Sequence, residues 1–466
     1  MKNNNNFSVL QNSFKVIFIV LSFATHMNGQ SLPTPSLPII VPAVPTLKPQ
    51  GMDNFLTPSN TPPSSGSNYQ NQQNQRIMDE VNQNEKLREQ TMQGIQADIA
   101  QFGGTPLYDL PSWSTAPGAE HYRSVFDKML AVNVDNYSIK DINFQIENAY
   151  FKNQLSKEEF DRNIKQTADF ILAKMKDRNL DKNSNTAKNF MLFEFFTQPM
   201  EVKGFKEKHF PIKYDFEDYW GRENWAKMFV TKLLKTNTGQ CHSMPLLYLI
   251  LAEAINAEAY LAISPNHSYI KFQDEKGKWY NLELTNGMLT VPSFILNNGY
   301  ITAEAIQNKI YMQNLTKQQL LSQFYTDLAS GYVHKFGYDE FVENVINKAL
   351  ELYPTSINAN MVKANLNTER LQYVVKTLGI DTTTQQGREK ILNYPHAVEI
   401  LKQMQIQYKV IDELGFQYMP ADAYERWLGS LKNEKNKQDS EREKEQLKRL
   451  SKALKNSNNK INKNKT

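Results

Sequence analysis

Cysteine is almost absent from this sequence, with Cys241 the single example in 466 residues. An intramolecular disulfide framework is therefore excluded, and any thiol chemistry must belong to one residue. Histidines with metal-ligand spacing are also missing, because His121, His209, His334 and His396 are scattered along the chain. The sequence contains no phosphate-binding loop and no Gly-rich dinucleotide fingerprint. We therefore expect neither a metal nor a cofactor.

An excess of charge of one sign is lacking over most of the chain. There are 53 Lys and Arg residues against 49 Asp and Glu residues, which gives a formal net charge of +4. The last stretch, 432–466, holds 12 basic and 5 acidic residues, a local charge of +7, which leaves −3 for everything before it. The body of the protein thus has no basic footprint for nucleic acid, and we expect no nucleic-acid partner.

A long hydrophobic run is missing near the N-terminus. Lys2 and Lys15 bracket a polar segment, and the apolar run from Val16 to Ala24 has nine residues where a membrane span needs roughly 20. This pattern is typical of a secretory signal peptide that is cleaved close to Gln30, and a retained N-terminal anchor is the alternative. The absence of a following cysteine excludes a bacterial lipoprotein anchor. We expect an exported protein of the periplasm, the cell envelope or the medium.

Composition divides the chain into six parts. Nine of the 20 prolines fall within 31–75, and an Asn/Gln-rich run follows, which favours solvated and extended backbone over a packed core. The predicted parts are a signal peptide at 1–30, a largely disordered linker at 31–118, a helical region at 119–200, a core at 201–300, a helical region at 301–431 and a charged tail at 432–466.

Helical spacing of apolar residues dominates the region before the core. Ser156, with Glu159 three residues later, predicts a capping box at the start of one helix. A further helix over 186–196 carries aromatic residues, Phe190, Phe193 and Phe196, which we expect in the core.

The region after the core is again helical. Part of it is similar in spacing to a tetratricopeptide repeat, at Tyr325, Leu328, Ala329, Tyr332, Ala349 and Pro354. One repeat has no second repeat to stack on, so we predict a helical hairpin that packs on a neighbouring domain. A tetratricopeptide-like peptide-binding role is the alternative.

The segment around Cys241 carries the strongest local signal. Gly239 is expected to end the preceding segment of regular structure, and Pro245 is tolerated in the first turn of a helix. Cys241 is therefore expected beside the start of a helix. The helix continues through 246–255 and is apolar on nearly every side, which is typical of a buried central helix. Backbone N–H groups at such a start lower a thiol pKa and can stabilise an oxyanion.

Alternating apolar residues follow this helix. They predict three short strands at 259–264, 267–273 and 279–285, the last two joined by a charged turn. His267 opens the second strand and Glu283 lies near the far end of the third. An antiparallel hairpin would therefore place these two side chains next to each other.

Cys241, His267 and Glu283 are together the parts of a nucleophilic triad. The carboxylate would orient the imidazole, while the other ring nitrogen faces the thiol. Asn281, on the same strand face as Glu283, is the competing orienter. His242 is the rival base, but it adjoins Cys241 in sequence, so its side chain is expected to point elsewhere.

These segments resemble the transglutaminase-like superfamily of cysteine acyltransferases and proteases, which has a papain-like core, and above all its SirB1-related bacterial branch. The matching segments lie within roughly 224–287 and are Gly239-Gln240-Cys241, Pro265-Asn266-His267, Trp279-Tyr280-Asn281-Leu282-Glu283 and Thr285-Asn286-Gly287. The resemblance implies an α+β fold in which a central helix packs on a small antiparallel sheet, flanked by helical N- and C-terminal regions.

The sequence departs from this superfamily in two places. Glu283 stands where the superfamily more often has Asp. No upstream side chain is identifiable as the oxyanion donor, which leaves Trp225, Asn237 and Gln240 as candidates.

The leading hypothesis is an exported enzyme that acts on amide bonds of peptides or proteins. Cys241 would form a thioester that water or an amine resolves, with a peptide or protein as substrate. The alternative is an inactive transglutaminase-like domain that serves as a peptide- or protein-binding module in the cell envelope. A structural envelope protein tethered by the linker or the basic tail is a third hypothesis. The sequence leaves the oligomeric state open.

Overall fold

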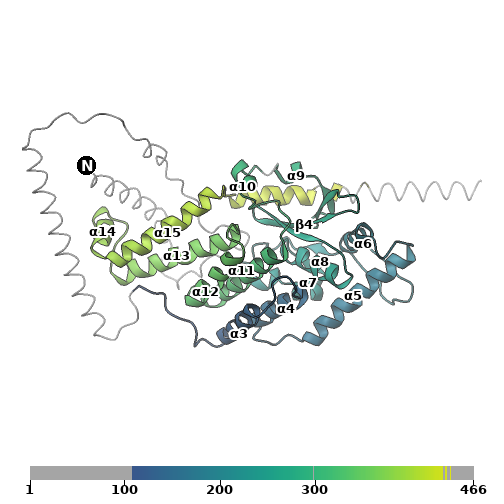
Figure 1. Ribbon diagram of the computed structural model, residues 1–466, viewed down its shortest axis with the longest axis horizontal. Helices are drawn as coiled ribbons and strands as arrows, with labels where there is room; N and C mark the ends of the chain where they lie inside the picture. The colour runs from purple at the N-terminus through teal and green to yellow at the C-terminus, as the bar shows by residue number, and fades with distance from the viewer. Residues whose placement is uncertain (1–107, 297–298, 434–435, 438–440, 442–466) are drawn as a thin grey trace, which may run out of the picture.

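A computed structural model describes residues 108–433 except 297–298, together with 436, 437 and 441. The expected signal peptide, the linker up to residue 107 and most of the charged tail lie outside the described residues. Within them, helices surround a small antiparallel sheet, as Figure 1 shows, so the coarse α+β prediction is confirmed.

In the part of the chain that the structure describes, the first four helices precede strand β1: α3 (Ala119–Leu130), α4 (Ile139–Tyr150), α5 (Lys157–Asp177) and α6 (Asn185–Thr197). The last three begin after a serine whose hydroxyl accepts a backbone N–H of the first turn. The capping box predicted at Ser156 is present only in part. Its hydroxyl accepts the N–H of Glu159, but it donates to the carboxylate of Glu158.

The core position expected for Phe190 is wrong, because its side chain is 45% exposed. Phe196 is buried and Phe193 is half-buried. A spacing of three residues falls short of a full turn, so Phe190 and Phe196 lie about 120° apart around the helix. On the buried side of α6, Phe195 lies against Phe170 of α5 and Phe196 lies against Tyr248 of α8.

The segment before the central helix is short and irregular. Strand β1 (Lys213–Tyr214) pairs in parallel with β2 (Thr238–Gly239), and η2 (Trp225–Met228) and α7 (Val230–Thr236) lie between them in sequence. The central helix α8 (Ser243–Ala254) follows β2, and every residue from 243 to 252 is buried. The prediction of a buried central helix is confirmed, since α4, α5, α6, α7 and the sheet all pack against it.

The sheet contains four antiparallel strands in chain order: β3 (Tyr260–Ser264), β4 (His267–Gln273), β5 (Trp279–Glu283) and β6 (Met288–Thr290). The three predicted strands are confirmed to within two residues at each end. The fourth strand was not predicted, because three residues are too few to show an alternating pattern. Asn266, in the tight turn before β4, has a φ of 57°, which asparagine tolerates better than most residues.

The C-terminal half is helical apart from its connections. Its elements are α9 (Pro292–Leu296), α10 (Ala303–Gln307), α11 (Lys317–Phe336), α12 (Glu340–Leu352), α13 (Ile357–Thr377), α14 (Gln385–Lys390), η3 (Ile391–Asn393) and α15 (Pro395–Glu413). The predicted hairpin is formed by α11 and α12, and α11 packs against α3 and α4. No helix within the described residues has both the length and the apolar character needed to cross a bilayer.

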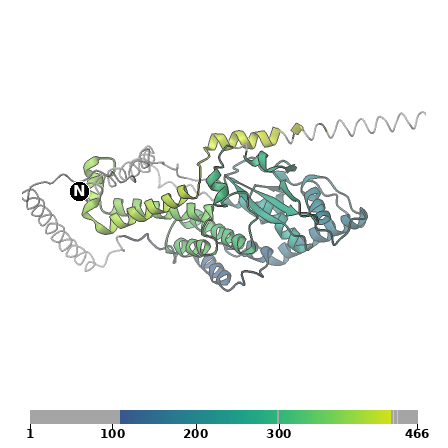
Figure 2. The same ribbon diagram turned by 45° about the horizontal axis from the view of Figure 1, so that its top comes forward.

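A last helix, 421–433, returns the chain to the sheet. In Figures 1 and 2 it is drawn in yellow and runs beside the strands, far from α14. The reversal occurs at Gly415, which has a φ of 84°; a Cβ there would lie 2.5 Å from the backbone nitrogen of Ala305. Only glycine fits this close approach. The inner face of the helix presents Tyr424, Leu428 and Leu431 to the core.

Leu251→Ala tests the role of α8 as the centre of the core. Leu251 is fully buried, so we expect the substitution to lower the free energy of unfolding by about 2–5 kcal/mol. The matched control is Leu289→Ala on β6, where the side chain is 59% exposed and the expected change is below about 0.5 kcal/mol. Urea denaturation followed by circular dichroism measures both, and equal losses would contradict the assignment.

Candidate active site

The structure brings together the three residues singled out from the sequence. Cys241 lies two residues before α8, His267 is the first residue of β4, and Glu283 is the last residue of β5. All three are buried, with exposed fractions of 2%, 3% and 2%. The site therefore lies where the start of the central helix meets the end of the β4–β5 hairpin.

Close packing fixes the backbone at Cys241. A Cβ on Gly239 would lie 2.6 Å from side-chain atoms of Leu233 and of Met244, so the chain passes here only without a side chain. Ser243 accepts the N–H of Gln240 at 2.9 Å, and Ser268 donates its hydroxyl to the carbonyl of Cys241. Cys241 is thus held from both the helix and the strand.

A direct hydrogen bond joins the histidine and the carboxylate. His267 Nε2 lies 2.7 Å from Glu283 Oε2, and the other carboxylate oxygen accepts the N–H of Thr285 at 2.9 Å. In the β4–β5 register Glu283 is not directly opposite His267 but one diagonal position away. Such neighbours are about 7–8 Å apart at the backbone, a distance that suits the longer side chain of glutamate.

The electrostatics favour an ion pair between the thiol and the imidazole. Burial alone would lower the pKa of His267, but the charge of Glu283 and the thiol outweigh it and raise the pKa to about 10. Burial alone would raise the pKa of Cys241, but its interaction with His267 outweighs it, so the thiol pKa is lowered. A raised imidazole pKa and a lowered thiol pKa together favour thiolate and imidazolium at neutral pH.

The second ring nitrogen of His267 is free to serve the thiol. Nδ1 is buried and has no hydrogen-bond partner, since Glu283 engages only Nε2. Besides its interaction with His267, the sulfur of Cys241 contacts the carbonyl of Asn266 at 4.0 Å and the hydroxyl of Tyr424 at 3.8 Å. Loose geometry between nucleophile and base is common before substrate binds.

The two rival residues face other partners. His242 Nε2 lies 3.4 Å from Asp327 Oδ2 on α11. Burial lowers the pKa of His242, but Asp327 outweighs this effect and raises it, which favours the charged imidazole. The charged form of His242 in turn lowers the pKa of Cys241. On β5, it is Glu283 and not Asn281 that is hydrogen-bonded to the ring.

Two of the three oxyanion candidates have structural roles. Trp225 packs in a cluster with Met228 and Phe229, and Asn237 donates to the carbonyls of Phe210 and Pro211. Gln240 lies next to the thiol. Its Nε2 makes only a long contact of 3.5 Å with a backbone carbonyl, and its Oε1 is buried without a partner.

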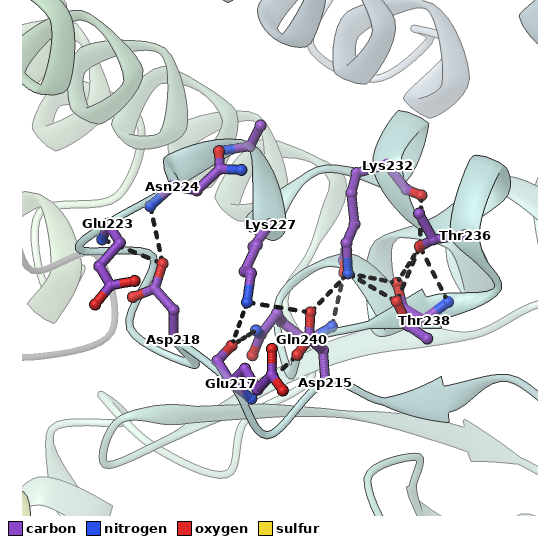
Figure 3. Close-up of polar contacts among 12 residues, drawn as sticks. Asp215, Glu217, Asp218, Glu223, Asn224, Lys227, Lys232, Thr236, Thr238 and Gln240 are labelled. Atoms are coloured by element: carbon purple, nitrogen blue, oxygen red, sulfur yellow. Dashed lines mark hydrogen bonds and ion pairs between the residues drawn. The ribbon is translucent and has the colours of Figure 1, made fainter.

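The loop 215–224 runs past Gln240 and is held by polar contacts. Figure 3 shows Lys232 reaching Asp215 and Thr238, while Lys227 and Gln240 converge on Glu217. These contacts come from α7, η2 and β2, so the loop is tied to the elements that position the nucleophile. This loop is therefore held beside Gln240, the residue before Cys241.

The helical region predicted at 301–431 includes most of the helix 421–433, but sequence reasoning did not place this helix at the site. It supplies two aromatic residues there. The ring of Trp427 lies 4.8 Å from the ring of His267 at an interplanar angle of 72°, and Tyr424 contacts the thiol. The spacing of Tyr424, Trp427, Leu428 and Leu431 indicates a buried helix face. It does not indicate which surface that face covers.

A small hollow, partly open to solvent and with room for about one water molecule, lies on the side of His267 that faces α11 and α13. Its lining includes His242, Asn266, His267 and Gln323. The side-chain amide nitrogen of Asn266 is buried there without a hydrogen-bond partner. A water molecule thus fits beside His267 on a side that the helix 421–433 does not line.

No protein-family model and no curated protein sequence matches this chain. Among solved structures, the chain is similar to a crystal structure of menin that reveals the binding site for the Mixed Lineage Leukemia protein. The identity is 12% over 68% of this chain and 91% of that chain, and the TM-score is 0.29. A TM-score of that size carries no argument about fold or function.

Glu283→Gln tests the electrostatic coupling in the site. Removing the carboxylate charge lowers the pKa of His267, so the thiolate loses its cationic neighbour and we expect the Cys241 pKa to rise by roughly one unit or more. Thiolate ultraviolet absorbance against pH measures this value, because the chain has one cysteine. The control is Glu304→Gln at an exposed position on α10. Superimposable titrations of wild type and Glu283→Gln would contradict the coupling.

Proposed function

We propose that this protein is an exported, transglutaminase-like cysteine enzyme with a papain-like core, which acts on amide bonds of peptides or proteins. The observation that carries the proposal is the buried Cys241–His267–Glu283 constellation, in which the thiol pKa is lowered and the imidazole pKa is raised. Perturbed pKa values of this kind favour a functional site over simple packing.

The proposed reaction has two halves. The Cys241 thiolate attacks the amide carbonyl carbon, and the tetrahedral intermediate collapses as His267 gives its proton from Nδ1 to the departing amine. The product is a thioester on Cys241. Water or an amine then attacks the thioester and loses a proton to His267, and the sulfur leaves as thiolate. Glu283 holds the ring and its charge throughout.

The residues just before α8 are the proposed source of oxyanion stabilisation. Within the first turn of α8, Met244 and Leu246 already donate their N–H groups to the carbonyls of Gln240 and His242, and Pro245 has no N–H. Gln240 supports the proposal, because its amide group makes no strong hydrogen bond. Trp225 and Asn237 are not proposed, since other contacts occupy them.

The acceptor for the thioester is proposed to enter through the hollow beside His267. This space adjoins the base that would deprotonate water or an amine. It is separate from the side covered by Tyr424, so acyl donor and acceptor need not share one path. The hollow has room for water, so hydrolysis is compatible with it as it stands, whereas transfer to a bulky amine requires a wider opening.

The second candidate function is a peptide-binding module without turnover. The observation that favours it is the closed site, in which the thiol is 2% exposed and contacts Tyr424. Association with the cell envelope through the linker or the basic tail is proposed for either function. Both segments lie largely outside the described residues.

The two candidates differ in their reaction with p-nitrophenyl acetate. For an enzyme we expect acetylation of Cys241 with release of more than one equivalent of nitrophenolate, and faster release when hydroxylamine is added as acceptor. Mass spectrometry locates the acetyl group, and Cys241→Ala corrects for acetylation elsewhere. Release that stops at one equivalent favours the binding module. Release that is equal in Cys241→Ala contradicts thiol catalysis.

A further inference from the structure

The helix 421–433, named here the cover helix, lies against both the thiol and the imidazole of the site. We propose that it is a releasable cover that keeps the site closed, and that a peptide segment bearing an aromatic residue takes its place on the loop 215–224. This inference rests on the proposed function, because it names how that site is regulated and what it accepts.

Distances make the closed geometry incompatible with reaction. Tyr424 places its hydroxyl 3.8 Å from the sulfur of Cys241, and Trp427 places its ring 4.8 Å from the ring of His267. Reacting atoms must approach to about 3–3.5 Å. An amide carbonyl therefore has no room above the sulfur until Tyr424 moves away.

The cover helix is bound through one face. Its residues Tyr424, Leu428 and Leu431 are 1%, 3% and 0% exposed, whereas its opposite face is open to solvent. At the edges Tyr219 donates to Glu425 at 2.7 Å, and Lys432 lies 4.9 Å from the centre of the Phe216 ring. The cover helix is therefore held mainly through a single row of buried residues. It can separate without disturbing the packing of the other helices on the sheet.

The connection to the rest of the chain permits such a separation. The cover helix follows the turn at Gly415, whose carbonyl accepts a hydrogen bond from Thr302 at 2.7 Å. All strands of the sheet and the central helix α8 precede this turn in sequence. Release of the cover helix thus removes no strand and breaks no hydrogen bond of the β4–β5 ladder.

The surface beneath the cover helix is already organised for an aromatic side chain. The rings of Tyr219 and Trp220 lie 5.6 Å and 4.5 Å from the ring of Tyr424. Their loop is fixed by Asp218, which accepts backbone N–H groups of residues 222, 223 and 224, and by the lysine contacts seen in Figure 3. An aromatic residue of a substrate would find the same partners as Tyr424.

Tyr424 and the thiol of Cys241 also shift each other's pKa. Burial and the charge of Cys241 raise the pKa of Tyr424 well above its ordinary value, so its hydroxyl keeps its proton. The same contact lowers the pKa of Cys241. The cover therefore shields the thiol without neutralising it, and release would expose a nucleophile that is already activated.

The test measures alkylation of the single cysteine by iodoacetamide in the full chain. Leu431→Asp places a charge in the buried stripe, and Ser430→Asp places the same charge on the exposed face of the same helix. We expect Leu431→Asp to accelerate alkylation on the order of tenfold or more, because local opening becomes more frequent. Ser430→Asp should match the wild type.

The proposal is overturned if Leu431→Asp, folded by circular dichroism and thermal unfolding, is alkylated no faster than the wild type. Tyr424→Ala is the second variant, since it removes the ring above the sulfur and leaves the leucine stripe intact. In addition, wild-type alkylation should depend weakly on low urea concentrations, as expected for local opening. A steep dependence equal to that of global unfolding also overturns the proposal.

His267→Ala separates this inference from the proposed function. Combined with Leu431→Asp, it should slow alkylation at pH 6, because the thiolate loses its partner. If Leu431→Asp is alkylated fast and adding His267→Ala leaves that rate unchanged, the proposal of a releasable cover stands and the proposed catalytic site is refuted. If His267→Ala slows alkylation and Leu431→Asp has no effect, the proposed catalytic site stands and the proposal of a releasable cover is refuted.

Discussion

The hydrogen bond between His267 and Glu283 determines the charge state of the whole site. It engages Nε2, leaves Nδ1 for the thiol, and supplies the negative charge that outweighs burial of the imidazole. The thiol pKa in turn depends on that imidazole. Because all three groups are buried, little water screens them, and the loss of one charge would be felt by the other two.

The sequence allowed the local structure of the site to be predicted, because short-range patterns specify it. An apolar run predicted α8, and a period of two residues predicted the strands that carry His267 and Glu283. Contacts between distant segments escaped prediction. The helical stripe of Tyr424 and Leu431 shows that one face is buried, but any apolar surface would satisfy that pattern. Phe190 was misplaced for a related reason, since an aromatic residue near a buried stripe need not belong to it.

The register of the β4–β5 hairpin explains why glutamate fits at position 283. A directly opposite pair would favour a shorter acid, whereas the diagonal neighbour of His267 requires a longer reach. The N–H of Thr285 holds the second carboxylate oxygen and limits the rotamers of this longer side chain. Strand pairing thus accommodates glutamate at position 283.

The order of segments along the chain has a consequence for biosynthesis. His267 and Glu283 are separated by 16 residues, whereas Cys241 and Tyr424 are separated by 183. Domains generally begin to fold from the N-terminal side during synthesis. The triad can therefore assemble while the segment that shields it is still being translated, so the nascent protein passes through a period in which its thiol is unprotected.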